Sequence, residues 1–199
     1  FDGSMTDTEV KINGQSAGAI HQGAFYRFKY DISKLLDYTK TNTLEVTVSK
    51  MSSDASVNNA ERLADYWVFG GIFRPVFLEA MPANYIDYVG IDAKADGSFA
   101  MQVWPKGLTK DAVVVTTITD ANKKMLGKIK APVPKGAENV IVNVKLDGIK
   151  TWTSETPNLY AANVQLQDAA GKKLYELNEK FGFRTIEIRY GQGIYINGT

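Results

Sequence analysis

The chain has 199 residues, no cysteine, one histidine (His21) and 23 basic against 22 acidic side chains. This length, with 44% hydrophobic residues, predicts one large or two ordinary domains with a real core and argues against intrinsic disorder. A net charge of +1 provides no field for binding nucleic acid or an anionic membrane. The lack of cysteine excludes a disulfide framework, cysteine-ligated metals and a thiol nucleophile.

No apolar run reaches the ~18 residues of a membrane-spanning helix, and no charged start followed by a hydrophobic stretch marks a signal peptide. We therefore expect a soluble protein. The chain begins at Phe1 and ends at Asn197-Gly198-Thr199, so we expect an excerpt of a longer protein. Its location stays open, with a periplasmic or secreted one slightly favoured.

Short runs with a period of two open the chain and predict strands. Residues 9–12 alternate charged and apolar side chains and are followed by Asn13-Gly14, which predicts a tight hairpin. The same alternation predicts half-buried strands at 28–32 and 44–48. Between them, residues 31–36 give the one helix signal, a single turn.

The segment 70–78 predicts a strand buried on both faces at its end, with Pro75 at an edge or bulge because proline cannot donate a ladder hydrogen bond. Residues 81–84 then break the pattern. We predict domains at 1–82 and 83–190, with 191–199 starting a further strand.

A second series of short strands, separated by glycine turns, predicts an immunoglobulin-like sandwich. Trp104 or Trp152 would fill its centre in place of a disulfide. The Lys-rich and Pro-rich residues 126–136 predict a loop or an edge. The predicted strands are 86–91, 98–104, 112–119, 140–146, 161–167, 174–177 and 181–188.

Residues with catalytic or metal-binding potential are sparse. His21 lies in a Gly-rich turn with no neighbour that resembles an activated serine, so we interpret it as a turn or surface residue and predict no hydrolytic triad. No His, Asp and Glu cluster has metal-ligand spacing, so no metal site is predicted.

Several ordered segments resemble glycoside hydrolase family 2, which includes β-galactosidases, β-glucuronidases and β-mannosidases. The most specific is 65–78, an acid and a tryptophan followed by Gly-Ile-Phe-Arg-Pro-Val. The resemblance covers essentially the whole chain in order. The other segments are 1–3, 9–18, 25–36, 42–48, 152–160, 181–184 and 193–198.

This resemblance implies an all-β chain: the second half of an N-terminal jelly-roll (galactose-binding-like) domain, then an immunoglobulin-like sandwich. It also implies that the catalytic glutamates belong to a (β/α)₈ barrel beginning after Thr199. The dipeptide Asn178-Glu179 is the type that carries the acid/base at barrel strand ends, but here we expect it in a solvated loop. The fragment is therefore expected to have no catalytic residue.

The resemblance also implies site residues. Asp65 matches the acid that reaches from the jelly roll into the pocket and binds the terminal sugar, in some members beside a sodium ion; the alternative is a loop acid paired with Arg62 or Arg74. Trp67 either faces a sugar or is buried between domains. Arg74 and Arg184 are interpreted as structural or interdomain residues, like Trp152.

The leading hypothesis is a non-catalytic accessory part of a retaining β-galactosidase, without a cofactor of its own. Its expected partners are a β-galactoside bound through the parent enzyme, the downstream barrel and, in a homo-oligomer, a second copy. A β-glucuronidase parent is the near alternative. An autonomous carbohydrate-binding module, with Tyr26, Tyr66 and Trp67 as a platform, or a purely structural sandwich would be the others.

Overall fold

The computed structural model describes residues 1–65 and 67–199. Over these residues it contains fourteen strands and one helix, which confirms the all-β prediction. The chain divides into two compact units, Phe1–Glu79 and Ala80–Thr199, each described by itself. No helix in the described ranges is long and apolar enough to cross a membrane.

The first unit has two small antiparallel sheets. Strand β2 (Asp7–Ile12) lies between β3 (Gln15–Ser16) and β4 (Leu44–Ser49), and β1 (Ser4–Met5) pairs with β5 (Gly71–Ile72). The predicted hairpin and the strand over 44–48 are confirmed. Asn13 and Gly14 take φ angles of 52° and 78° between β2 and β3, the left-handed pair that this turn type requires.

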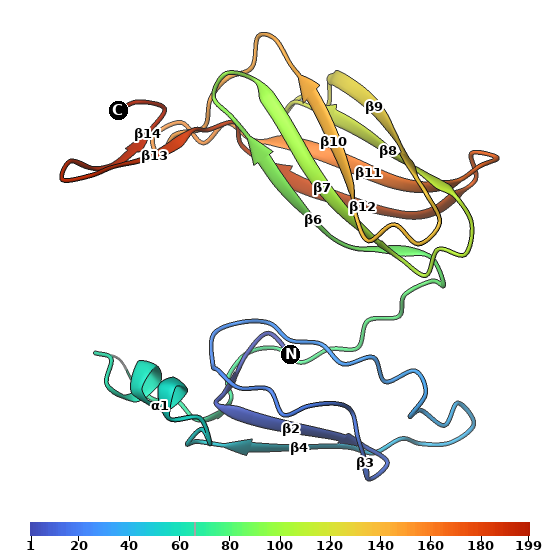
Figure 1. Cartoon of the computed structure of the whole chain (residues 1–199), viewed down its shortest axis with the longest axis vertical. Helices are drawn as coiled ribbons and strands as arrows, with labels where there is room; N and C mark the ends of the chain where they lie inside the picture. The colour runs from blue at the N-terminus through green and yellow to red at the C-terminus, as the bar shows by residue number, and fades with distance from the viewer. Residues whose placement is uncertain (66) are drawn as a thin grey trace. The chain divides into compact units, whose positions relative to one another are not determined.

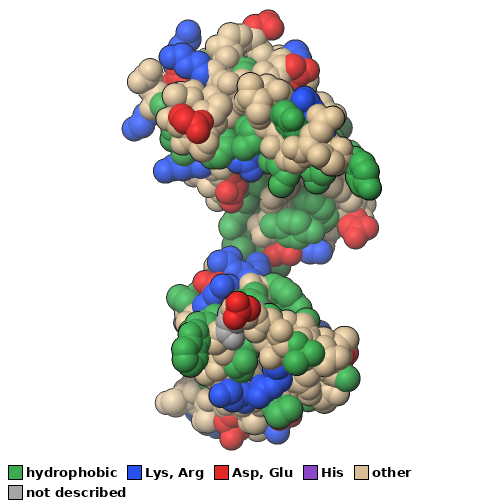
Figure 2. Space-filling view, turned by 90° about the vertical axis from the view of Figure 1, so that its left-hand side faces the viewer, with side chains coloured by type: hydrophobic (Ala, Val, Ile, Leu, Met, Phe, Trp, Pro, Cys, Tyr) green, Lys and Arg blue, Asp and Glu red, His purple; other side chains and the backbone are tan. Residues whose placement is uncertain are grey.

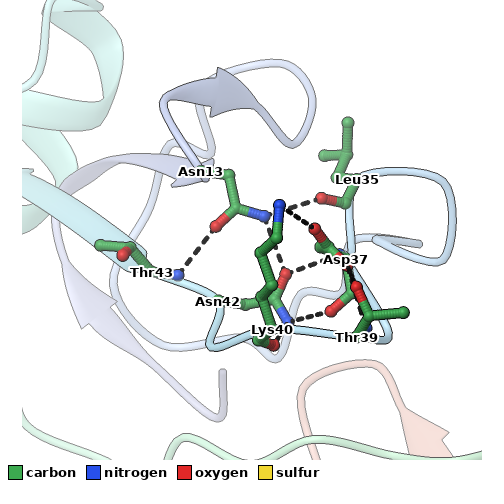
Figure 3. Close-up of polar contacts among 7 residues, drawn as sticks. All are labelled: Asn13, Leu35, Asp37, Thr39, Lys40, Asn42 and Thr43. Atoms are coloured by element: carbon green, nitrogen blue, oxygen red, sulfur yellow. Dashed lines mark hydrogen bonds and ion pairs between the residues drawn. The ribbon is translucent and has the colours of Figure 1, made fainter.

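Amide side chains, rather than a strand, hold the long connection between β3 and β4 (Figure 3). Asn13 Nδ2 donates to Leu35 O at 3.0 Å and to Asn42 Oδ1 at 2.8 Å, while Asn13 Oδ1 accepts from Thr43 N at 2.9 Å. Asn42 Nδ2 donates in turn to Asp37 O at 2.8 Å. The hairpin turn is thereby joined to residues 35–43, the last part of the connection before β4.

Two predictions for this connection are wrong. Residues 28–32 alternate half-buried and exposed side chains as predicted, but they form no strand. Among the described residues, the backbone of Phe28 exchanges hydrogen bonds with Phe1, at 3.1 and 3.2 Å, and this pairing does not extend into a ladder. The helical turn predicted at 31–36 is a non-helical turn closed by Leu35 N donating to Ile32 O at 2.9 Å.

The helix and last strand of the first unit also differ from prediction. The helix is α1 (Ala55–Arg62), which the sequence patterns did not indicate. The strand predicted at 70–78 is limited to β5, and Phe77 and Leu78 are exposed rather than buried. Pro75 has no N–H, and its carbonyl accepts a single hydrogen bond from Asp2 N at 3.0 Å.

The second unit is a sandwich of two antiparallel sheets (Figure 1). One sheet has the order β10-β7-β6 and the other β12-β11-β8-β9. The sheets approach each other along both sides, where β9 contacts β10 and β12 contacts β6. The bounds are β6 (Tyr85–Ala93), β7 (Ser98–Lys106), β8 (Ala112–Thr119), β9 (Met125–Val133), β10 (Val140–Lys145), β11 (Tyr160–Asp168) and β12 (Lys173–Phe181).

The core of the sandwich consists of the inward residues of both sheets, without a tryptophan. Trp104 is half-buried on the outer face and stacks on Tyr88 with ring centroids 4.2 Å apart, and Trp152 is half-buried beside Arg184. The prediction that Trp104 or Trp152 fills the centre is therefore wrong. The largest fully buried side chains there include Phe99, Met101, Val103, Ile118, Leu166 and Phe183.

Three further expectations concern this unit. The alternative of an edge for residues 126–136 is confirmed, because β9 is the outermost strand of its sheet. Asn178 and Glu179 are exposed as expected but lie within β12, not in a loop. Residues predicted as one strand at 181–188 end β12 and then form part of β13 (Ile186–Arg189), which pairs with β14 (Gly193–Ile196) in a hairpin projecting from the sandwich (Figure 1).

Candidate functional site

The loop that carries Asp65 and Trp67 follows helix α1. Asp54 caps the helix, since its Oδ1 accepts from Ser56 N at 2.8 Å and Val57 N at 3.4 Å. Hydrogen bonds to the Ser56 side chain and backbone lower the pKa of Asp54 below its usual value. A charged acceptor at the first turn stabilises the helix and fixes where it begins.

The last turn of α1 is joined to the rest of the first unit. Glu61 is buried, and its Oε1 accepts from Ala24 N at 2.5 Å. Arg62 donates from its guanidinium to Lys50 O at 3.0 Å. The loop therefore follows a helix that is capped at its first turn by Asp54 and bonded to the rest of the unit at its last turn by Glu61 and Arg62.

Asp65 and Trp67 are both exposed, and 86% of the Trp67 surface is accessible. Across the described residues, the Asp65 carboxylate has no hydrogen bond or ion pair, and the two predicted arginine partners bind backbone carbonyls instead. Burial of Trp67 does not occur within this unit. The pair offers one carboxylate and one open indole ring two positions apart.

A buried polar group beside the start of helix α1 was not predicted from the sequence. Asp7, 8% exposed, accepts from Ser53 N at 2.8 Å and Ser53 Oγ at 3.0 Å, and joins β2 to the residues that precede α1. Burial raises the pKa of Asp7, but hydrogen bonds from Ser52, Ser53 and Gln22 outweigh it and lower the pKa overall. The Ser52-Ser53-Asp54 run, typical of a helix start, was the available signal.

His21 belongs to the same region and has a structural environment. Contrary to the turn or surface prediction, it is half-buried and forms a β-bridge with Thr8. Its ring stacks on Phe28 at a centroid distance of 3.9 Å, and Nε2 lies 2.9 Å from Gly23 O. Burial lowers the pKa of His21, which favours the neutral imidazole in this stack.

Arg74 ties the Gly-Ile-Phe-Arg segment to the start of the chain. Its guanidinium donates to Phe25 O at 3.1 Å and to Asp2 O at 3.4 Å, and it lies 5.3 Å from the Phe73 ring centroid. A Cβ at Gly3 would come within 2.9 Å of the Arg74 side chain, so the close passage needs glycine. These are internal contacts of the first unit.

In the second unit, Trp152 and Arg184 come together. The Arg184 guanidinium lies 4.8 Å from the Trp152 ring centroid, a cation–π distance. Trp152 N donates to Phe183 O at 2.8 Å, which holds the two segments side by side. Both residues line a cleft of about 540 Å³ in this unit.

The platform of the binding-module alternative is only partly described, because Tyr66 lies outside the described residues. Tyr26 is 60% exposed and packs edge-on against His21 at 5.7 Å. For the sodium ion implied beside Asp65, the described residues provide no group of three or more His, Asp or Glu that could hold a metal. Asp65 alone does not make such a site.

The charged side chains do not form one large patch of a single sign on the face shown in Figure 2. Acidic and basic side chains are interspersed on the face shown in Figure 2, in keeping with the net charge of +1. What Asp65 and Trp67 can do chemically is accept hydrogen bonds from hydroxyl groups and stack on an apolar ring face. Both actions bind a ligand, and neither breaks a bond.

Comparison with known proteins gives a family match: residues 84–184 match the model described as Glycosyl hydrolases family 2. A beta-galactosidase of Thermoanaerobacter pseudethanolicus is 26% identical over 100% of this chain and 27% of its own length. A putative beta-glucuronidase of Formosa agariphila is 33% identical over 100% of this chain and 18% of its own length.

Solved structures of larger proteins also match this chain over nearly its whole length. A putative beta-galactosidase from Bacteroides fragilis superimposes with a TM-score of 0.83 and 25% identity, covering 100% of this chain and 32% of that one. A beta-glucuronidase from Bacteroides uniformis, at 21% identity and a TM-score of 0.81, shares the fold. The chain thus spans less than a third of the length of these relatives.

Proposed function

Because the chain belongs to glycosyl hydrolase family 2, we propose that it forms the non-catalytic β-sandwich part of a glycoside hydrolase whose catalytic barrel lies outside these residues. The observation that carries the proposal is the coverage: relatives match the whole chain with 18% to 32% of their own length. In this proposal residues 1–82 belong to a jelly-roll domain, 83–190 form an immunoglobulin-like domain, and 191–199 lead toward the barrel.

The proposed role of the first unit is to bring Asp65 to the edge of the sugar pocket. The acid lies on a loop whose helix is capped by Asp54 and tied to Ala24 through Glu61. Its carboxylate is exposed and unpaired within the described part of the chain. A carboxylate in this state can accept strong hydrogen bonds from adjacent sugar hydroxyls.

The proposed substrate of the parent enzyme is a terminal β-galactoside, hydrolysed with retention. Asp65 favours a neutral sugar, because a glucuronide would bring a second carboxylate toward it. Arg62 and Arg74 would not offset this repulsion, because their guanidinium groups donate to backbone carbonyls. A β-glucuronide is the second candidate, supported by the 33% identical Formosa relative. Trp67 would stack on the apolar face of either sugar.

The test is expression of the protein from the complete reading frame, beside residues 1–199 alone, with chromogenic β-galactosides and β-glucuronides as substrates. We expect hydrolysis of the galactoside by the longer protein only. Asp65→Asn should lower kcat/KM by about 10- to 100-fold, the value of a hydrogen bond to a charged group. Asp147→Asn, an exposed turn acid of the second unit, is the control. Hydrolysis by residues 1–199 would contradict the proposal.

The autonomous binding module is retained as an alternative because Trp67 and Tyr26 are so exposed. Calorimetric titration of residues 1–199 with galactosides and glucuronides discriminates the two functions. Millimolar or tighter binding that is lost in Trp67→Ala would favour the module. No binding heat would favour the accessory role in a longer enzyme.

A further inference from the structure

The cleft of the second unit is lined in part by the neighbouring edge strands of the two sheets, β6 and β12. Inward residues of the edge strand β6, Val89 and Ile91, form an apolar part of its lining, and the edge strand β12 contributes Phe181. Its volume of about 540 Å³ is within the range of small-ligand sites, roughly 300–1,000 Å³. Such sites combine apolar walls with a few convergent polar groups.

Glu179 is the unusual residue of this lining. In the register of β12 it lies opposite Ala162, a core residue, so its side chain is on the inward side of the strand, like that of Phe181. Glu179 is nevertheless exposed, and it is one of the residues that line the cleft. Among the described residues, the Glu179 side chain has no hydrogen-bond or ion-pair partner. The cleft therefore presents a free acceptor.

Trp152 and Arg184 supply a ring and a donor in the same cleft. The guanidinium lies over the indole at 4.8 Å, and a Cβ at Gly182 would come within 2.7 Å of Trp152 Cβ. Glycine at 182 thus lets the tryptophan lie close against the end of β12. The guanidinium has no ion-pair partner among the described residues and keeps its donors for a ligand.

We propose that this cleft binds a neutral pyranose sugar, at a site separate from Asp65 and Trp67. The apolar C–H face of the ring would pack on Val89 and Ile91, and vicinal hydroxyls would donate to Glu179 and accept from Arg184. Because Glu179 and Arg184 carry opposite charges, a polyhydroxyl without net charge can bind to both. A charged sugar would satisfy one and oppose the other.

An added β-strand from another polypeptide is the competing occupant, since β6 and β12 both have an unpaired edge within their described sheets. Charged side chains crowd these edges, among them Asp92, Lys94 and Lys180, with Asp92 and Lys94 paired at 2.9 Å. Charges on an edge strand, including inward ones such as Glu179, are a recognised protection against strand addition. They favour the sugar.

The experiment is a titration of ¹⁵N-labelled residues 1–199 with methyl β-galactoside, methyl β-glucoside and methyl β-mannoside, followed by NMR. We expect at least one sugar to shift the Gly182 amide and the Trp152 indole N–H with a Kd on the order of 1 mM. Glu179→Gln should weaken this binding about tenfold. Glu138→Gln, another exposed acid outside the cleft lining, should leave it unchanged.

Absence of chemical-shift changes at Gly182 and Trp152 with all three sugars would overturn the proposal. An unchanged Kd in Glu179→Gln, relative to the wild type, would also overturn it. Line broadening across β6 and β12 that depends on protein concentration alone would indicate strand pairing and would also overturn it. Arg184→Gln provides a second variant on the opposite side of the ligand, with the same loss expected. Shifts near Asp65 report separately on the proposed pocket acid, so either site can fail without the other.

Discussion

Asn13 connects parts of the first unit that lie 22 to 30 positions apart in the sequence, through contacts to Leu35, Asn42 and Thr43 (Figure 3). It also has a left-handed backbone conformation, with φ of 52°. One side chain therefore serves the hairpin turn and the loop together. The two contributions can be separated by substitution.

Asn13→Gly keeps the turn conformation and removes the side-chain hydrogen bonds, so we expect it to lower the free energy of unfolding of the first unit by about 1–2 kcal/mol. Asn13→Ala should cost about 1 kcal/mol more, because alanine is strained at positive φ. Thermal denaturation measures both. The control is Asn122→Ala, in an exposed turn of the second unit; equal effects in all three variants would refute the separation.

Glu176 gives the sandwich a predicted pH dependence. A hydrogen bond from Lys173, then those from Asn163 and Gln165, lower the pKa of Glu176 from 4.5 to about 2. Because the folded pKa lies below the unfolded one, the stabilisation is complete above pH 4.5 and is lost as the pH falls toward 2. The stability difference between wild type and Glu176→Gln should therefore shrink over this window in denaturant titrations. A stability difference that stays constant between pH 4.5 and 2 would contradict this prediction. Glu138→Gln, at another exposed acid, is the matched control and should show no such pH dependence.

Among elements, the hairpin of β13 and β14 is attached at its base through Asn197 and Thr185, and Thr185 Oγ1 accepts from Ala95 N at 3.1 Å. Asn197 Oδ1 accepts from Thr185 N at 2.9 Å, and Nδ2 donates to Trp152 O at 3.0 Å. The exposed isoleucines Ile188 and Ile194 add no burial within the described unit. An isolated two-stranded hairpin is marginally stable in water, so these bonds decide how firmly it is held.

Replacing Asn197 by glycine keeps the positive φ of 54° accessible and removes both bonds. We expect amide hydrogen exchange in residues 186–196 to accelerate by tenfold or more, while the amides of β11 keep their protection. Gln192→Gly, at the tip of the same hairpin, should leave the base of the hairpin protected. Unchanged exchange at Ile188 in Asn197→Gly would show that other contacts hold the hairpin.

Predictability from sequence differs between elements for physical reasons. Strand β8 has the predicted bounds, 112–119, because its β-branched side chains pack well on the pleated surface of a strand that has neighbours on both sides. Helix α1 was missed because it is short and mostly polar, and its ends depend on Asp54 and on the contact of Glu61 with Ala24. Residues 28–32 show the expected alternation, but a strand also needs a partner, which the sequence of one segment does not reveal.

The candidate site shows the same division. Asp65 and Trp67 can be proposed from the sequence because they lie within one contiguous motif. The cleft was not, because it joins Val89, Trp152 and Glu179 from distant segments. Trp152 and Arg184 were each singled out as structural, yet only the fold reveals that one lies over the other.

At the scale of the whole chain, the two units have separate cores and unequal packing. The sandwich has a continuous buried cluster that includes Phe99, Val164 and Leu166. The first unit exposes Leu44, Phe69 and Leu78. Apolar burial is the main stabilising contribution in folding, so we expect the sandwich to be the more stable unit.

Leu166→Ala tests this independence, because Leu166 is fully buried in the sandwich. We expect calorimetry of residues 1–199 to show two transitions, with the substitution lowering only the more stable one, by about 2–5 kcal/mol of unfolding free energy. Leu78→Ala, at an exposed position of the first unit, should shift neither appreciably. A single transition that moves as a whole in Leu166→Ala would show that the units unfold together.

The anchoring of the hairpin by Asn197 has a consequence for glycosylation. Asn197-Gly198-Thr199 is an acceptor sequence for N-linked glycans, and the glycan would be joined to Nδ2, the atom that donates to Trp152 O. A folded sandwich therefore shields this asparagine, whereas a glycan added during secretion from a eukaryotic host would compete with the anchor. In protein from such a host, a glycan attached before folding would weaken the contact between Asn197 Nδ2 and Trp152 O, while the hydrogen bonds between Asn197 and Thr185 remain available.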